Sequence, residues 1–197
     1  MVRIIIYMHR QPFLETLYKY RESASKTDIQ ITDELIGHVL KNKDCFYRNR
    51  EEGAKDIAAS VLLLSKDLKK GLFIWHKKIQ EWTQPGGHAD GESNIFRVAH
   101  KELEEETGIV NVSFLGNMPF HIHKFDYAPH VFGYRKSIFN IFFVAKLPPN
   151  QKPRIIEPTK CEKMRWLSKE EIISIIKSNP HESTIELINK WDNLTQN

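Results

Sequence analysis

The sequence predicts an α/β protein in which a mixed β-sheet is sandwiched between helices and preceded by a helical extension. Residues 1–52 space their apolar side chains at helical intervals, as in "QPFLETLYKYRE" and "TDIQITDELIGHVLKN". After them the chain alternates between segments rich in β-branched and aromatic residues and segments with helical spacing. We therefore expect a helical N-terminal extension over residues 1–52 and an α/β domain with C-terminal helices over residues 53–197.

The individual elements follow from local composition. Strands are predicted at 57–65, 71–78, 112–123, 137–147 and 161–168. Helices are predicted at 94–107, 168–178 and 182–191. Ser168 begins the second of these helices with Glu171 three residues later, which is a capping-box arrangement.

Overall composition excludes several classes of protein. The chain has 197 residues and a net charge of +4 from 29 basic and 25 acidic residues, which is too mild and dispersed to indicate nucleic-acid binding. Cys45 and Cys161 lack metal-ligand spacing and form no disulfide framework, so a reducing, cytoplasmic setting is expected. No apolar run approaches the ~20 residues that a membrane span needs.

The segment "NIFRVAHKELEEETG", residues 94–108, is the most informative stretch. At about 100° per residue its apolar stripe consists of Ile95, Val98, Ala99 and Leu103. Glu102 and Glu106 fall inside that stripe, Glu105 lies at its edge and Glu104 points the other way. The core-facing side of the helix is therefore predicted to turn acidic in its last two turns.

Carboxylates that face a packed sheet cost several kcal/mol unless a positive charge is held near them. The basic residues of this helix, Arg97, His100 and Lys101, lie on its outer side. Glutamates at i, i+3 and i+4 suit a hard divalent cation such as Mg²⁺. The alternative is an acidic helix end that is simply solvated.

The residues around this helix complete a compact motif. "QPGGHADGES" supplies Pro85 and two glycines in a tight loop, Ser93 is a candidate N-cap, and Gly108 is placed to end the helix. The unit resembles the Nudix box, G-x5-E-x7-R-E-U-x-E-E-x-G-U, in which U is a bulky aliphatic residue. The matching residues are Gly87, Glu102, Leu103, Glu105, Glu106, Gly108 and Ile109. Lys101 stands in place of the family's arginine and Ser93 in place of its upstream glutamate, and residues 1–52 lie outside the resemblance.

This resemblance implies a pyrophosphohydrolase that cleaves the diphosphate linkage of a nucleoside diphosphate derivative. Nucleotide sugars, dinucleotides, ADP-ribose and nucleoside triphosphates all remain open as substrates. Glu102, Glu105 and Glu106 would be the metal ligands and catalytic residues, with Mg²⁺ or Mn²⁺ as cofactor, and the ion would activate a water for attack on phosphorus. A Nudix-fold module that senses a nucleotide with weak or no catalysis is the second interpretation, and an interaction protein with an incidental acidic helix is the third.

Substrate binding is expected at six residues, namely Gly86, Gly87, His88, Lys101, Tyr134 and Arg135. The glycines let the backbone approach a ligand, and His88 either touches phosphate or hydrogen-bonds the loop. Tyr134 and Arg135 belong to the aromatic and basic segment 123–136, which we interpret as a strand connection that stacks on a base, or as a packed aromatic hairpin.

Weaker candidates remain. His121 and His123 alternate along a predicted strand and so share a face, where they could be two metal or phosphate ligands, but two surface histidines are the favoured interpretation. Glu157 and Glu162 are candidates for an additional catalytic carboxylate. The apolar faces of residues 1–52 must pack on the domain or on a second copy, so a homodimer is a further hypothesis.

Overall fold

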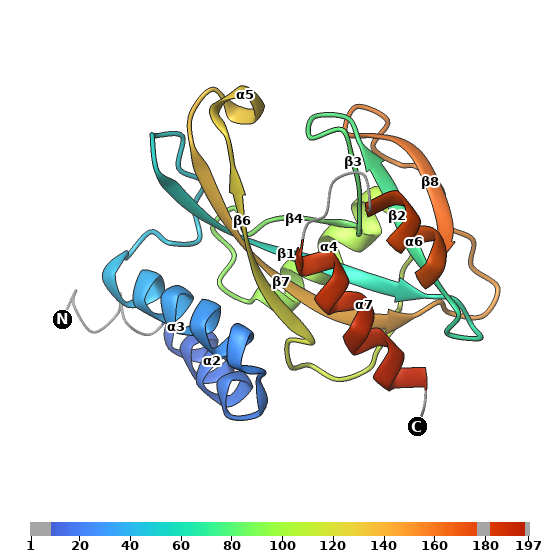
Figure 1. The fold of residues 1–197 in the computed structure, drawn as a ribbon, viewed down its shortest axis with the longest axis horizontal. Coiled ribbons are helices and arrows are strands. Elements are labelled where there is room, and N and C mark those ends of the chain that lie inside the picture. Colours follow the sequence, from blue (N-terminus) through green and yellow to red (C-terminus); the bar gives the residue numbers. More distant parts are fainter. Residues whose placement is uncertain (1–8, 177–181, 196–197) are drawn as a thin grey trace. The chain divides into compact units, whose positions relative to one another are not determined.

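The computed structural model describes residues 9–176 and 182–195 (Figure 1). Its elements, in chain order, are α2 (Gln11–Ser23), α3 (Lys26–Lys41), β1 (Ala54–Leu64), β2 (Lys70–His76), β3 (Glu81–Thr83), β4 (Gly86–His88), α4 (Ile95–Thr107), β5 (Ser113–Phe114), β6 (His121–Tyr127), α5 (Pro129–Phe132), β7 (Lys136–Lys146), β8 (Cys161–Ser168), α6 (Lys169–Ile176) and α7 (Glu182–Thr195). The described strands follow the order β3-β2-β1-β7-β5, while β4 pairs with β1, β6 with β7 and β8 with β2. The predicted α/β class, a mixed sheet with helices against it, is confirmed.

By its internal contacts the chain divides into two compact units. The first unit comprises residues 1–61, 86–102 and 116–143, and the second comprises 62–85, 103–115 and 144–197. The division at residue 52 that the sequence suggests is a different one and stays a prediction.

In the first unit, α2 and α3 form a helical pair that precedes the sheet (Figure 1). Ser25 caps α3 because its side chain accepts a hydrogen bond from the Asp28 amide. The two helices bury the apolar residues Phe13, Leu14, Leu17, Leu35, Ile36 and Val39. The helices predicted before residue 52 are thus confirmed, and residues 1–8 of that segment lie outside the described part of the chain.

The sheet of the first unit carries the motif residues. β4 pairs antiparallel with β1, with Ala58 opposite His88 and Ser60 opposite Gly86. β6 and β7 form an antiparallel hairpin whose connection contains the short helix α5. Within this hairpin the Tyr127 ring lies 5.2 Å from the Phe132 ring and 6.3 Å from the Phe125 ring, while a role of segment 123–136 in stacking on a base stays a prediction.

In the second unit, β2 lies between β3 and β8, both antiparallel to it. Trp191 of α7 is fully buried and donates its indole N–H to the Leu68 carbonyl at 2.9 Å. The predicted capping box is confirmed: the Ser168 amide donates to Glu171 at 2.7 Å, and the Glu171 amide donates to the Ser168 hydroxyl at 3.3 Å. Residues 177–178 of the helix predicted there lie outside the described part.

Two sequence expectations about strands are wrong. The single strand predicted at 112–123 is divided into β5 and β6, because Gly116, with φ of +116°, and Pro119 turn the chain between them. The tight loop predicted at the two glycines contains strand β4, because Gly86 lets this segment approach β1 closely enough to pair. Among the helices that the structure describes, none is long and apolar enough to cross a membrane.

Candidate active site

Helix α4 carries the acidic cluster as the helical wheel predicts. Glu102 is 2% exposed and Glu106 is fully buried, whereas Glu105 is partly buried and Glu104 is exposed. Gly108 ends the helix with φ of +68° and donates its amide to the Glu104 carbonyl at 2.8 Å. Three carboxylates at positions i, i+3 and i+4 thus share one side of a helix, two of them inside the protein.

The N-terminus of α4 corrects one expectation. Ser93 is not the N-cap, because the Asn94 side chain accepts the hydrogen bond from the Arg97 amide at 3.1 Å. Glu92 in turn accepts from the Asn94 amide at 2.8 Å. Asparagine is as good a cap as serine, so residue preference alone does not choose between the two neighbouring positions.

Residues 86–91, which we call the glycine loop, contain β4 and lie against Glu102. A side chain at Gly87 would collide with the Glu102 carboxylate, and one at Gly86 would collide with Ser60 and the backbone of β1. Close packing therefore requires glycine at both positions. At Gly87 the main chain lies directly against Glu102, a predicted metal ligand.

Lys101 lies on the exposed side of α4, as predicted. Its Nζ is 3.9 Å from Glu102 Oε1, and its side chain is 58% exposed. An ion pair this long and this exposed contributes little. The arrangement leaves Lys101 beside Glu102, at the acidic end of the helix.

Glu106 contacts Cys161 of β8, the last strand of the second unit. The Cys161 thiol donates a long hydrogen bond to Glu106 Oε1, with sulfur and oxygen 3.9 Å apart. Burial and the nearby negative charge of Glu106 raise the pKa of Cys161 to about 12, so the thiol stays neutral at physiological pH. It therefore neutralises none of the charge of Glu106.

The segment before β8 runs along the end of α4. The amides of Arg154 and Ile156 donate to the carbonyls of Thr107 and Glu106, at 3.0 and 3.2 Å. Glu157 follows directly and its charge acts on the Cys161 thiol, as that of Glu106 does. This brings one of the two additional carboxylate candidates into the neighbourhood of the acidic helix end.

The two candidates differ in their surroundings. Glu157 is partly buried and pairs with Lys160 at 2.7 Å. Glu162 is exposed on β8 and pairs with its neighbour Lys163 at 3.3 Å. On position alone Glu157 is the better candidate.

A buried ion cluster that sequence reasoning missed lies in the first unit. Asp56 is 1% exposed; its Oδ2 is 2.5 Å from Lys136 Nζ and 3.2 Å from His88 Nε2, and its Oδ1 accepts from the Asn49 amide at 2.9 Å. Burial alone would raise the pKa of Asp56, but the bonds from His88, Asn49 and Lys136 together lower it. The available signal was two opposite charges, Asp56 and Lys136, in the mostly apolar strands β1 and β7.

This cluster gathers two of the predicted substrate-binding residues. His88 contacts Asp56 directly, and the ring of Tyr134 lies 5.9 Å from Lys136 Nζ. Arg135 instead pairs with Glu52, at 4.0 Å, on an exposed surface. Roles in substrate binding for these residues stay predictions.

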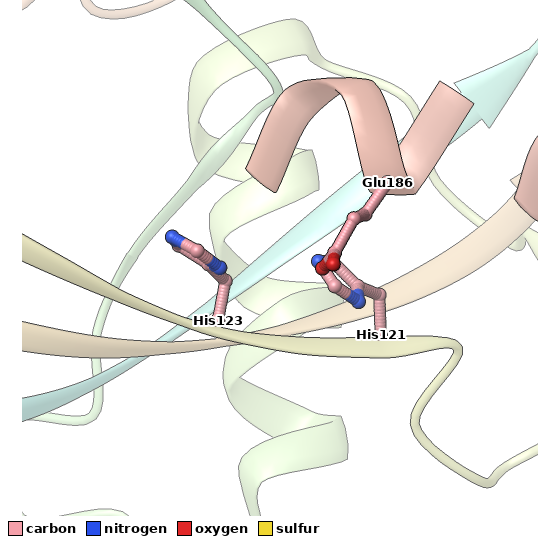
Figure 2. A group of neighbouring side chains, drawn as sticks. All are labelled: His121, His123 and Glu186. Carbon is pink, nitrogen blue, oxygen red and sulfur yellow. The ribbon is translucent and has the colours of Figure 1, made fainter. Parts of the chain in front are cut away.

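The histidine pair corrects a further expectation. Figure 2 shows His121 and His123 on the same side of β6, and their rings stack with centroids 6.0 Å apart. They are not two surface histidines: His121 is fully buried, with Nδ1 3.3 Å from Asp28 of α3. The prediction that both side chains share a face of the strand is confirmed. The position of the helical extension that covers His121 could not be predicted from the sequence. Glu186, also drawn in Figure 2, belongs to α7 in the second unit.

The donor set fits a divalent metal ion. Three glutamates share one side of α4, two of them with almost no exposure, and Gly87 keeps the space beside Glu102 free of a side chain. Hard oxygen ligands of this kind suit Mg²⁺ or Mn²⁺. Buried carboxylates at the negative end of a helix are costly without a cation, so the arrangement and the cofactor are chemically consistent.

The motif, its helix and the sheet define the class of protein. Residues 54–187 match the model of the NUDIX domain, so the chain belongs to the NUDIX family. Family membership makes it, in general terms, a nucleotide pyrophosphohydrolase. A search of curated proteins found no match.

Solved structures share this fold at low sequence identity. An Ap4A hydrolase binary complex from C. elegans has a TM-score of 0.55 at 19% identity, covering 71% of this chain and 96% of that one. The MutT protein from Methanosarcina mazei Go1 has a TM-score of 0.55 at 14% identity, covering 75% and 99%. The E. coli dihydroneopterin triphosphate pyrophosphohydrolase has a TM-score of 0.50 at 15% identity, covering 64% and 88%.

Proposed function

We propose that this protein is a divalent-metal-dependent hydrolase that cleaves the diphosphate linkage of a nucleoside diphosphate derivative. The observation that carries the proposal is the burial of Glu102 and Glu106 on one side of α4, in a matched Nudix motif. Glu102, Glu105 and Glu106 would hold Mg²⁺ or Mn²⁺. The ion would supply charge neutralisation of the diphosphate oxygens and acidification of the attacking water.

The chain's own residues have distinct parts in this proposal. Gly87 allows the loop to lie against Glu102, which orients that carboxylate. Glu157 is the candidate to accept a proton from the attacking water, since it lies near the end of α4 and is partly buried. Lys101 and His88 are the candidates to bind phosphate oxygens, and Tyr134 is the candidate to stack on a base.

The substrate's second moiety has a candidate location. A cavity of about 890 Å³ lies in the first unit among α3, residues 42–53 and the start of β1, and Tyr47 belongs to its wall. Tyr47 is 62% exposed and offers an aromatic face. Substrates with a second ring system, such as dinucleotides, are therefore included among the candidates.

The test is phosphate release in a coupled phosphatase assay. The panel contains Ap4A, a nucleotide sugar, ADP-ribose, dihydroneopterin triphosphate and the nucleoside triphosphates. At least one should be hydrolysed with Mg²⁺ or Mn²⁺ and not with EDTA. Nucleotide binding by calorimetry without hydrolysis of any panel member would instead support the sensing module.

Three broader expectations belong to the same proposal. Cys45 and Cys161 are both buried free thiols, which supports a cytoplasmic setting. The division into an extension over 1–52 and a hydrolase domain over 53–197 is retained as a proposal, because the family match begins at residue 54. A homodimer also remains a proposal, which sedimentation of the full chain would test.

A further inference from the structure

The connector between α3 and β1, residues 42–53, holds the glycine loop through a two-pronged ion pair. Arg48 Nε lies 2.5 Å from Asp90 Oδ1, and Arg48 Nη2 lies 2.6 Å from Asp90 Oδ2. A planar guanidinium that meets both oxygens of a carboxylate fixes orientation as well as distance. Asp90 has φ of +48°, in the left-handed region that aspartate and asparagine adopt more readily than most other residues except glycine.

A second tether lies beside this pair. The Gly91 amide donates to the Phe46 carbonyl at 2.9 Å. The Tyr47 ring covers Gly91 so closely that a side chain there would meet a ring carbon at 2.8 Å. Phe46 is itself 3% exposed and lies 5.7 Å from the Phe13 ring of α2. The glycine loop is thus anchored, through the connector, to the core of the helical extension.

The same loop lies against a predicted metal ligand. Gly87 meets the Glu102 carboxylate, and the Ala89 amide donates to the Ile57 carbonyl at 2.9 Å. The negative charges of Asp90 and Glu102 both raise the pKa of Arg48. Burial would raise the pKa of Asp90, but the bond and charge of Arg48 hold it below its ordinary value, which keeps the pair ionised at neutral pH.

We propose that Arg48 is a positioning residue of the active site, which fixes the glycine loop against Glu102 by holding Asp90. This inference rests on the proposed hydrolase function. It makes the connector, which precedes the family match at residue 54, a working part of the site. Displacing a loop by about 1 Å can cost 10²-fold in rate, so the effect belongs in kcat more than in KM.

The chain offers a closely matched control. Arg21 of α2 and Asp33 of α3 form the same two-pronged pair, at 2.5 and 2.9 Å, within the extension. The exposed fractions are similar, 44% and 49% for Arg21 and Asp33 against 43% and 40% for Arg48 and Asp90. Among the described residues, no hydrogen bond or ion pair joins Arg21 or Asp33 to residues 86–91, so this pair is a control of the same kind at another place in the protein.

The experiment compares Arg48→Ala, Asp90→Asn, their double variant and Arg21→Ala in the full chain, using the panel substrate that the wild type hydrolyses. Asparagine tolerates the backbone of residue 90 and removes the charge. We expect kcat to fall about tenfold or more in Arg48→Ala with KM within about twofold, and the double variant to be no slower than the slower single variant. Amides 87–91 should exchange hydrogen faster in Arg48→Ala and unchanged in Arg21→Ala.

The outcomes separate the two proposals. If the wild type hydrolyses no panel member, the proposed function fails, while hydrogen exchange still tests the tether. If the wild type is active and Arg48→Ala matches Arg21→Ala in kcat and in exchange, the inference is overturned. Additive losses in the double variant, or a rate loss explained by loss of folded protein in both Arg48→Ala and Asp90→Asn, also overturn it.

Discussion

The protein buries carboxylates in two regions whose surroundings differ. Asp56 in the sheet of the first unit is surrounded by cationic and hydrogen-bonding groups from Lys136, His88 and Asn49. Glu106 at the end of α4 faces the thiol of Cys161, whose pKa of about 12 keeps it neutral. Burial of charge is tolerable when it is paired within the protein, as at Asp56. The acidic end of α4 instead gathers three carboxylates on one side of a helix, and it is there that we propose a divalent cation binds.

The largest effect is expected where that cation would bind. Glu106→Gln should lower kcat by about 10³-fold or more at saturating Mg²⁺, because several kcal/mol of charge stabilisation depend on the metal's ligands. The fold should stay intact, or become slightly more stable in metal-free buffer, since repulsion among the glutamates falls. Glu104→Gln, on the exposed side of the same helix, is the matched control and should retain activity. A Glu106→Gln enzyme at nearly the wild-type rate would mean that the metal is misplaced.

At the paired carboxylate the effect should be on stability. Asp56→Asn leaves Lys136, which is 5% exposed, without its anion and should lower the free energy of unfolding by about 3 kcal/mol, measured in urea. The double change Asp56→Asn with Lys136→Met should recover most of that loss, because it removes both charges together. If Asp56→Asn alone is neutral, the cluster does not stabilise the fold.

The free energy of unfolding should depend differently on acid pH in the wild type and in Asp56→Asn. The pKa of Asp56 is lower in the folded protein than in the unfolded chain, so its contribution is present above about pH 4 and is lost as the pH falls through the folded value. Wild-type stability should therefore decrease more steeply below about pH 4 than that of Asp56→Asn. Parallel curves for the two proteins would count against an ionised Asp56.

The acidic helix could be predicted from sequence because its determinants are local. The 3.6-residue repeat fixes which glutamates turn inward, and the burial of Glu102 and Glu106 follows it. The Asp56 cluster could not be predicted, because it joins β1, β4 and β7 through strand pairing that no local pattern specifies. The same holds for Arg48 and Asp90, which are 42 residues apart in the chain. Local periodicity thus located the candidate metal ligands, whereas their supports required the structure.

A smaller effect is expected at the candidate proton acceptor. Glu157→Gln should lower kcat by about tenfold, ~1.4 kcal/mol, because general-base assistance would be lost while the metal ligands remain. Glu162→Gln is the matched control, since it is also a glutamate paired with a lysine but is exposed on β8. Equal rates for the two variants would remove Glu157 from the mechanism.

The smallest effect concerns Lys101, which stands where the Nudix box has arginine. Its Nζ is 3.9 Å from Glu102 Oε1, a distance at which a single mobile charge orients its partner weakly. The fork of an arginine could hold Glu102 more rigidly, so Lys101→Arg should raise kcat severalfold, by about 1 kcal/mol, with little change in metal affinity.

The opposite result for Lys101→Arg has its own physical reason. Ser93 occupies the upstream glutamate position, so an arginine at residue 101 could lack the carboxylate that normally receives it. The double change Ser93→Glu with Lys101→Arg supplies that carboxylate, and kcat and the Mg²⁺ concentration for half-maximal rate should be measured for both variants. A gain only in the double variant would show that the two positions act as a pair. No gain in either would indicate that the glycine loop is already held firmly enough by other residues, of which Arg48 is the one that the geometry favours.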